Sequence, residues 1–270
     1  MRIALFPDNP LWSIAALAIG YLGLAGYVYL FQERLLYFPD ESSVNMAGVF
    51  GLKPWPSENN FHGFLSSRPP ANCAGTFLVW HGNGGAALHR TYFTEALEGR
   101  GFRVVLLEYP GYCGRPGRPG EKTIIADALA AVDLARSAFP GPIYLLGESM
   151  GCGVAAEVAR ERSWVNGVVL LTPWSTLPDV AQSKYWYFPA RWLTRDRYDS
   201  VGNLSGYMGP VAVFLAENDE VVPARFGRRL FDSLKSHKRL WVFEGAGHNT
   251  WPNDPHQSWW DEATGFLSGR

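Results

Sequence analysis

The sequence contains few cysteines and almost no net charge, and each shortage excludes a class of function. Cys73, Cys113 and Cys152 are its three cysteines, and their spacing matches no zinc-binding pattern. The sequence does not decide between a Cys73–Cys113 disulfide and two free thiols, because the disulfide depends on an oxidising compartment. The 24 Lys and Arg residues nearly balance the 25 Asp and Glu residues, which leaves a formal net charge of -1. No electrostatic feature therefore favours nucleic acid as a partner.

Charge is absent altogether from one long stretch near the N-terminus. Residues 11–31 read LWSIAALAIGYLGLAGYVYLF, which is long enough to cross a bilayer as one helix. Trp12 and Tyr29 lie towards its ends, as aromatic residues do at membrane interfaces. We predict that residues 1–34 form a single-pass membrane anchor, with the remaining domain on the extracytoplasmic side. A cleaved signal peptide is the alternative, because Gly23-Leu24-Ala25 resembles a cleavage site, although the apolar run continues beyond it.

Short apolar strands alternate with helical segments from residue 75 onward. The expected strands are residues 76–80, 102–107, 143–146, 165–171, 211–216 and 239–243. This alternation predicts βαβ units and a mostly parallel sheet flanked by helices, within one α/β domain over residues 35–270. Residues 175–207 contain no strand pattern. We interpret them as a small helical cap, and an ordinary long crossover is the alternative.

The segment between the anchor and the first clear strand is less regular. Leu35-Leu36-Tyr37-Phe38-Pro39 should dock on the domain or on the membrane surface. Pro54 and Pro56 indicate loops. Residues 61–65 form a candidate edge strand, so the first strands of the sheet are hard to recognise in residues 50–65.

The pentapeptide Gly147-Glu148-Ser149-Met150-Gly151 lies between an expected strand and an expected helix. This is the context of a nucleophile elbow, in which a serine stands on a sharp strand-to-helix turn. The two glycines lack Cβ atoms, so the chain can turn while Ser149 takes a strained conformation. The helix start behind it offers the amide of Met150 to a developing negative charge. These flanks favour a catalytic serine over an ordinary Gly/Ser turn.

A serine nucleophile needs a histidine base that is oriented by a carboxylate. His248 follows an expected core strand in a Gly-Ala-Gly-His turn, and His256 is the second candidate. Asp219 follows another strand and lies between Ser149 and His248 in the sequence. The alternative acids are Glu217, Glu220 and Asp179. Because reactive groups collect at the carboxyl ends of parallel strands, we expect these residues to meet the turn at residues 81–83 there.

The motifs HGNGG, GESMG, ENDEVVP and GAGH, in this order and spacing, resemble those of the α/β-hydrolase superfamily. The apolar N-terminus with LLYFP, the segment EYPGY and the stretch Y-x-x-x-PARWLTRDRYDS resemble the membrane-anchored bud-emergence-type serine hydrolases. These stand near the serine aminopeptidase-like and prolyl oligopeptidase-like branches. The chain departs from that pattern at Glu108-Tyr109-Pro110, where Asp-Tyr-Arg is commoner, and in residues 50–65.

The resemblance implies an α/β-hydrolase fold and a role for each matched residue. It makes Ser149 the nucleophile, Asp219 the acid and His248 the base, with an oxyanion hole formed by the backbone amides of Asn83 and Met150. It implies no metal ion and no organic cofactor.

Aromatic residues of the expected cap indicate the substrate. We expect a pocket for a small-molecule or lipid-like acyl group, lined by Trp174, Trp186, Phe188 and Trp192. The sequence thus predicts a membrane-anchored serine hydrolase that cleaves an acyl ester, thioester or amide through an acyl-enzyme. A serine peptidase of the aminopeptidase-like kind is one alternative, and a non-catalytic hydrolase-like binding scaffold is another.

Overall fold

The computed structural model describes residues 10–269, so the first nine residues of the predicted anchor lie outside the described part. An eight-stranded sheet forms its centre, in the order β10-β9-β8-β7-β4-β6-β3-β2. Its strands are β2 (Leu52–Pro56), β3 (Phe61–Ser66), β4 (Thr76–Trp80), β6 (Arg103–Leu107), β7 (Ile143–Glu148), β8 (Gly167–Leu171), β9 (Val211–Ala216) and β10 (Lys238–Phe243). Six neighbouring strands, β10, β9, β8, β7, β4 and β6, are parallel, whereas β3 pairs antiparallel with both β6 and β2. The predicted mostly parallel sheet is confirmed.

Strand β2 corrects the sequence prediction for this region. Residues 61–65 were expected at the sheet edge, but β3 is covered by β2, which contains Pro54 and Pro56. A proline has no N–H for a strand ladder, so prolines are tolerated only where a strand has one partner or a bulge. β2 meets both conditions, because it is the outermost strand and its register shifts between Trp55 and Pro56. The prolines therefore mark an edge strand and not a loop.

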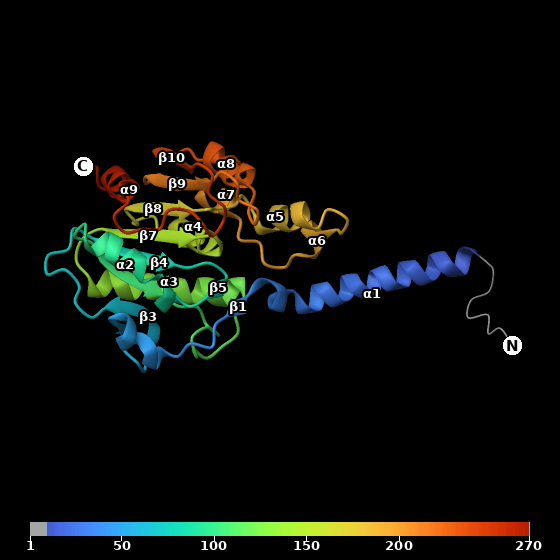
Figure 1. The fold of residues 1–270 in the computed structure, drawn as a ribbon, viewed down its shortest axis with the longest axis horizontal. Helices are drawn as coiled ribbons and strands as arrows, with labels where there is room; N and C mark the ends of the chain where they lie inside the picture. Colours follow the sequence, from blue (N-terminus) through green and yellow to red (C-terminus); the bar gives the residue numbers. More distant parts are fainter. Residues whose placement is uncertain (1–9, 270) are drawn as a thin grey trace.

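Helices cover both faces of the sheet (Figure 1). They are α2 (Thr91–Glu98), α3 (Glu121–Ala138), α4 (Met150–Glu161), α8 (Ala224–Ser233) and α9 (Trp259–Ser268), with 3-10 turns η1 (Val44–Phe50) and η2 (Ala87–Arg90). Side chains of α3, α4 and α8 share one core cluster with Leu78 and Trp80 of β4. Side chains of α2 and α9 share the other with Phe77 and Val79. The alternation along β4 is the period of two expected of a strand buried on both faces.

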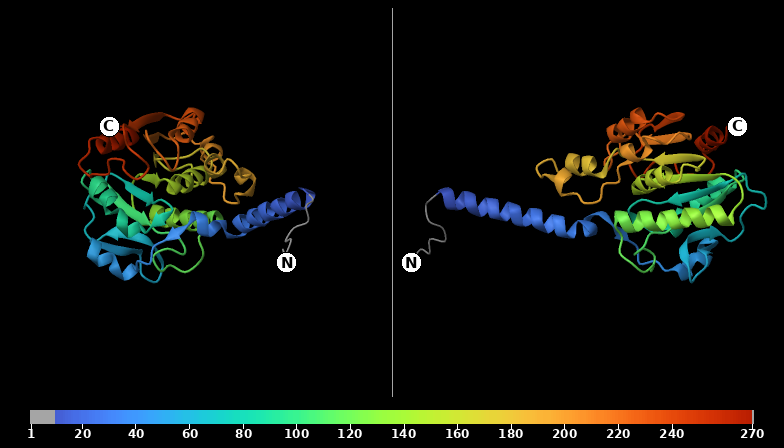
Figure 2. Two further views of the ribbon diagram at one scale, coloured as in Figure 1. Left: turned by 45° about the vertical axis from the view of Figure 1, so that its right-hand side comes forward. Right: turned by 180° about the vertical axis from the view of Figure 1, so that it is seen from behind.

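Helix α1 (Pro10–Leu36) extends away from this domain (Figures 1 and 2). It is long and apolar enough to be a candidate membrane span, and its apolar window is not buried inside the protein. Two residues after it, β1 (Phe38–Pro39) pairs with β5 (Gly84–Gly85), which follows the end of β4. The helix therefore joins the domain at the carboxyl edge of the parallel strands.

The segment between β8 and β9 contains three short helices, α5 (Leu177–Lys184), α6 (Ala190–Leu193) and α7 (Ser200–Leu204). α7 packs on α4, close to the sheet. α5 and α6 project from the domain on the same side as α1 (Figure 2). The expected helical insertion is present, and its outer part approaches the N-terminal helix.

Candidate active site

The turn between β7 and α4 holds Ser149 in a strained conformation. Its φ of 53° lies in the left-handed region, which residues other than glycine rarely adopt. The flanking glycines permit the turn because the backbone approaches itself there. A Cβ on Gly147 would lie 2.4 Å from the carbonyl carbon of Gly151, and one on Gly151 would lie 2.1 Å from the carbonyl oxygen of Trp80. The predicted elbow thus has a steric basis at both glycines.

Three side chains predicted from the sequence meet at the carboxyl edge of the sheet. Ser149 follows β7, Asp219 follows β9 and His248 follows β10. His248 Nε2 lies 2.9 Å from Ser149 Oγ, and its Nδ1 lies 2.7 Å from Asp219 Oδ2. All three side chains are buried. The imidazole therefore connects the hydroxyl and the carboxylate through two hydrogen bonds in a buried site.

The Asp219 carboxylate is fixed by the backbone that follows it. Its second oxygen, Oδ1, accepts hydrogen bonds from the amides of Val221 at 2.9 Å and Val222 at 2.6 Å. These contacts leave Oδ2 facing His248. Two amide donors on one oxygen and the imidazole on the other thus fix the orientation of the carboxylate.

The alternative acids and the alternative base have other partners. Glu217 accepts a hydrogen bond from the amide of Gly245, and Glu220 accepts one from the amide of His248 at 3.1 Å. Amide donors, those of Glu220 itself and of His248, lower the pKa of Glu220. Asp179 forms ion pairs with Arg191 and Arg229, and the alternative base His256 is exposed. The Glu217 and Glu220 contacts shape the turn that carries His248.

The turn after β4 lies directly against Ser149. A Cβ on Gly82 would lie 3.6 Å from Ser149 Cβ, so the turn that contains Gly82 and Asn83 borders the nucleophile. Met150 is the first residue of α4, and the N–H of a first helical residue has no acceptor within its helix. The two amides predicted for an oxyanion hole thus belong to segments that border the hydroxyl.

Asn83 is held by the end of α1 and by the segment that follows it. Its side-chain Nδ2 donates to the carbonyl of Leu36 at 2.6 Å, and its own carbonyl accepts from the amide of Phe38 at 3.0 Å and from Tyr112 Oη at 2.7 Å. From the sequence we expected residues 35–39 to dock on the domain or on the membrane surface. The structure places them on the candidate oxyanion turn.

Glu108 supports the same turn and was missed as a functional residue. Its Oε1 lies 2.9 Å from His81 Nε2, and its Oε2 accepts the amide of Ala87 at 2.8 Å. Tyr109 Oη donates to the carbonyl of His81 at 2.5 Å. A carboxylate directly after a buried strand was the available signal, but the sequence showed it only as a departure from the family pattern.

The four predicted pocket residues lie in different surroundings. Trp174 is buried in the core, where its Nε1 donates to the carbonyl of Tyr198. Phe188 is buried beside α1. Trp186 and Trp192 are 78% and 84% exposed, so neither forms the wall of an enclosed pocket. An acyl pocket lined by aromatic residues of the insertion thus stays a prediction.

The three cysteines are free thiols in the structure. Cys73 and Cys113, which the sequence allowed to form a disulfide, are therefore not bonded to each other here. Burial raises the pKa of Cys113 to about 12 and raises that of Cys152 well above its ordinary value. A thiol needs to ionise to act as a nucleophile. Neither buried cysteine thus competes with Ser149 at neutral pH.

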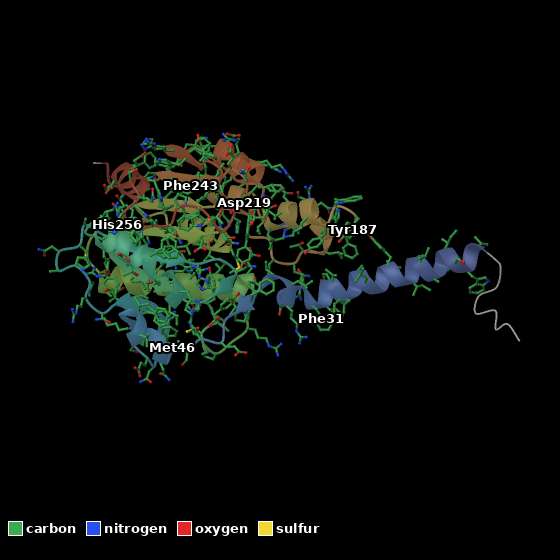
Figure 3. All side chains as sticks on the ribbon, in the orientation of Figure 1. Phe31, Met46, Tyr187, Asp219, Phe243 and His256 are labelled. Carbon is green, nitrogen blue, oxygen red and sulfur yellow. The ribbon has the colours of Figure 1, made fainter. Side chains whose placement is uncertain are left out.

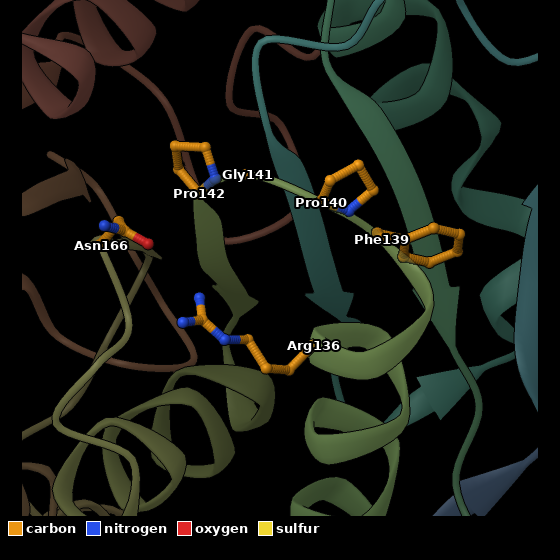
Figure 4. A pocket seen from close by; sticks show the side chains of 6 residues that line it. All are labelled: Arg136, Phe139, Pro140, Gly141, Pro142 and Asn166. Carbon is orange, nitrogen blue, oxygen red and sulfur yellow. The ribbon is translucent and has the colours of Figure 1, made fainter.

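A cavity of about 360 Å³ lies elsewhere on the domain (Figure 4). Its lining residues are Arg136, Phe139, Pro140, Gly141, Pro142 and Asn166. Pro142 immediately precedes β7, whereas Ser149 follows it, so this cavity is at the opposite end of that strand. In residues 10–269, no group of three or more His, Cys, Asp and Glu side chains is arranged to hold a metal ion.

Known proteins resemble the chain in sequence and in fold. The model of the alpha/beta hydrolase fold family matches residues 75–206. An uncharacterised protein of Mycobacterium tuberculosis is 32% identical over 245 residues, which are 87% of each chain. The lysophosphatidylserine lipase ABHD12 of Danio rerio is 30% identical over 197 residues, and the match spans 66% of this chain and 50% of the lipase. The Pyrococcus furiosus esterase Pf2001 has a TM-score of 0.68 at 17% identity, covering 87% of this chain and 98% of the esterase.

These likenesses agree with the structure on independent grounds. The family model covers the strand-turn-helix elbow, and the mycobacterial relative extends the similarity over most of the chain. The esterase shares the arrangement of the sheet and its helices at an identity that supports the fold alone. The chain therefore belongs to the α/β-hydrolase superfamily.

Proposed function

We propose that this hydrolase is a membrane-anchored serine hydrolase that cleaves acyl esters through an acyl-enzyme on Ser149. The observation that carries the proposal is the pair of hydrogen-bond distances, 2.9 Å and 2.7 Å, that join Ser149, His248 and Asp219. A hydroxyl becomes an effective nucleophile when a neighbouring base accepts its proton. The buried arrangement supplies that base and the carboxylate that orients it.

The catalytic sequence follows from the roles of the three residues. Ser149 Oγ attacks the acyl carbonyl while His248 Nε2 takes its proton, and Asp219 stabilises the imidazolium that results. The amides of Asn83 and Met150 donate to the carbonyl oxygen as it becomes negative. His248 then protonates the leaving alcohol. Water, activated by the same imidazole, hydrolyses the acyl-enzyme and restores Ser149.

An ester of a lipid is the substrate class that the relatives and the surface favour. ABHD12 is named as a lipase of lysophosphatidylserine, and the insertion carries large exposed aromatic side chains. A panel of acyl esters and amino-acid amides with purified full-length protein tests this choice. We expect turnover of the esters, and faster turnover of the amides would favour the peptidase.

The test that separates an enzyme from a binding scaffold is labelling with a fluorophosphonate. This reagent modifies serines that an adjacent base has activated. We expect one equivalent to react at Ser149, as located by mass spectrometry of the digested protein. A folded protein that does not react would support the scaffold.

Helix α1 supports anchoring, because its apolar face is exposed and no charge interrupts residues 11–31. Alkaline carbonate strips peripheral proteins from membranes but leaves spanning helices in place. We expect the full-length protein to stay in the membrane pellet after this treatment. A mature chain that begins near residue 26 and appears in the supernatant would favour the cleaved signal peptide.

Removing the Asn83 side chain should lower kcat by an intermediate factor. Asn83→Ala keeps the backbone amide but removes the hydrogen bond to the carbonyl of Leu36. The candidate oxyanion donor then loses one of its supports, and since removing a whole donor costs about 10²–10³ in kcat, we expect a loss of about tenfold. KM should change little, because the amide acts on the transition state.

A control for this variant is Gln32→Ala. Gln32 lies in α1, as does Leu36, the partner of the Asn83 side chain. Its own contacts are with Leu193 and Arg195 of the insertion and not with Asn83. Steady-state kinetics and melting temperatures for both proteins should show a fall in kcat only for Asn83→Ala, without a matching loss of stability. Equal kinetic losses in the two variants would contradict the proposed role of Asn83.

A further inference from the structure

The outer part of the insertion exposes an unusual amount of aromatic surface. We call residues 185–192 the aromatic loop. Its side chains Tyr185, Trp186, Tyr187 and Trp192 are 47%, 78%, 61% and 84% exposed. Large aromatic side chains are usually buried, and an exposed group of them marks an interaction surface. The surface is continuous with the apolar helix α1.

Direct contacts place the aromatic loop along α1. Tyr21 Oη donates to the carbonyl of Tyr187 at 3.4 Å, and the rings of Tyr21 and Phe188 lie 5.2 Å apart. Nearer the domain, Gln32 donates to the carbonyl of Leu193 at 3.0 Å and accepts from the amide of Arg195 at 2.7 Å. Figure 3 shows Tyr187 on the part of the insertion that reaches towards α1. The insertion follows the helix from Gln32 back to Tyr21.

The position of Tyr21 in α1 sets the depth of the loop. Between Tyr21 and Gln32 the helix rises about 16 Å, at ~1.5 Å per residue. The hydrocarbon core of a bilayer is about 30 Å thick, which is about the length of residues 11–31 as a helix. A helix that crosses the membrane over this stretch carries Tyr21 well below the surface. A loop packed against Tyr21 cannot then remain in water.

We propose that the aromatic loop inserts into the membrane leaflet nearest the domain, so that the bilayer itself is its partner. This inference rests on the proposed anchoring by α1. Trp and Tyr rings combine an apolar body with one polar group, and they concentrate at the boundary between headgroups and acyl chains. The insertion follows α1 from that boundary, near Gln32, inwards to the level of Tyr21.

Basic side chains border the aromatic loop. Lys184 and Arg191 are exposed at its two ends, and Arg195 and Arg197 follow α6. Arg191 and Arg195 form ion pairs with Asp179 and Glu33, so Lys184 and Arg197 supply most of the free positive charge. Long basic side chains can keep their stems in an apolar layer while the charge reaches lipid phosphates. This arrangement fits an insertion whose ends stay at headgroup level while its tip, at residues 186–188, lies deeper.

The aromatic loop is also connected to the candidate active site. It begins directly after α5, whose Asp179 pairs with Arg229 of α8 and whose Ser183 accepts a hydrogen bond from Arg225 of α8. Helix α8 begins five residues after Asp219. The insertion that carries the loop is thus joined to the helix that follows the candidate acid. The substrate class that follows is an acyl lipid resident in that leaflet, which reaches Ser149 without crossing bulk water.

Depth-dependent fluorescence quenching in nanodiscs tests the insertion. Single cysteines replace Trp186 or Trp192 in the full-length chain, with Cys73→Ser to remove the more accessible native thiol, and each carries a bimane label. Phosphatidylcholine with a nitroxide on the acyl chain is the quencher. Leu17→Cys in α1 reports on the anchor, and Val49→Cys on η1, 83% exposed, reports on a surface outside both elements.

We expect quenching at positions 17, 186 and 192 and none at position 49. If position 17 is quenched while 186 and 192 are not, the inference about the loop is overturned and the anchor stands. If position 17 is not quenched, the proposed anchoring fails, and the inference fails with it.

Activity on two substrates provides a second readout. Trp186→Asp combined with Trp192→Asp places charge where the bilayer disfavours it. We expect at least a tenfold lower rate of fatty-acid release from a long-chain lysophospholipid in vesicles, with hydrolysis of p-nitrophenyl acetate unchanged. Val49→Asp is the matched control and should change neither rate. Equal losses on both substrates, or no loss on the lipid, would overturn access from the membrane.

Discussion

Ser149→Ala should lower the rate of ester hydrolysis by a factor on the order of 10⁶, the scale of loss when a serine nucleophile is removed from such a triad. The hydroxyl lies 2.9 Å from the base and is the atom that forms the acyl-enzyme in the proposed reaction. Alanine keeps the Cβ and the backbone of the elbow, so the fold should persist. Hydrolysis of p-nitrophenyl esters and fluorophosphonate labelling measure the loss, and thermal unfolding checks that the protein is folded.

Cys113→Ala is the matched control for the nucleophile. Cys113 is buried, and its pKa of about 12 keeps the thiol protonated at neutral pH, so this variant should retain both activity and labelling. Persistent labelling of Ser149→Ala would contradict the assignment. Loss of labelling in a folded Cys113→Ala protein would transfer the chemistry to the thiol.

Asp219→Asn should lower kcat by about 10⁴, as in the general triad template. The structure gives a specific reason. Asp219 Oδ1 accepts the amides of Val221 and Val222, so the oxygen of an asparagine would stay with these donors and its NH₂ would face His248 Nδ1. His248 would then accept at Nδ1 and carry its proton on Nε2, where it cannot act as the base for Ser149.

Glu217→Gln and Glu220→Gln are the controls for the acid. Each glutamine keeps an oxygen that can accept from the amide of Gly245 or of His248, so the turn around the base should persist. We expect losses of less than about tenfold, because neither carboxylate contacts the imidazole nitrogens. Near-full activity of Asp219→Asn, together with a large loss in either control, would place the acid elsewhere.

Much of the candidate site was predictable because its parts are local. Ser149 stands in a five-residue pattern between an apolar strand and a helix, and Asp219 and His248 each follow an apolar strand directly. The expected strand at residues 211–216 coincides with β9. Once a parallel sheet was inferred, geometry required the residues after its strands to share one edge, since parallel strands all end on the same side.

The sequence by itself determined the α/β-hydrolase fold, the apolar helix and the three side chains that the structure joins, because each depends on local pattern and strand order. Only the tertiary structure decided where residues meet across long separations. It placed Leu36 on Asn83, used two prolines in an edge strand, and turned Trp186 and Trp192 outward beside α1. Aromatic composition favours burial in some apolar surrounding, but whether that surrounding is a core, a pocket or a bilayer depends on which elements pack beside it.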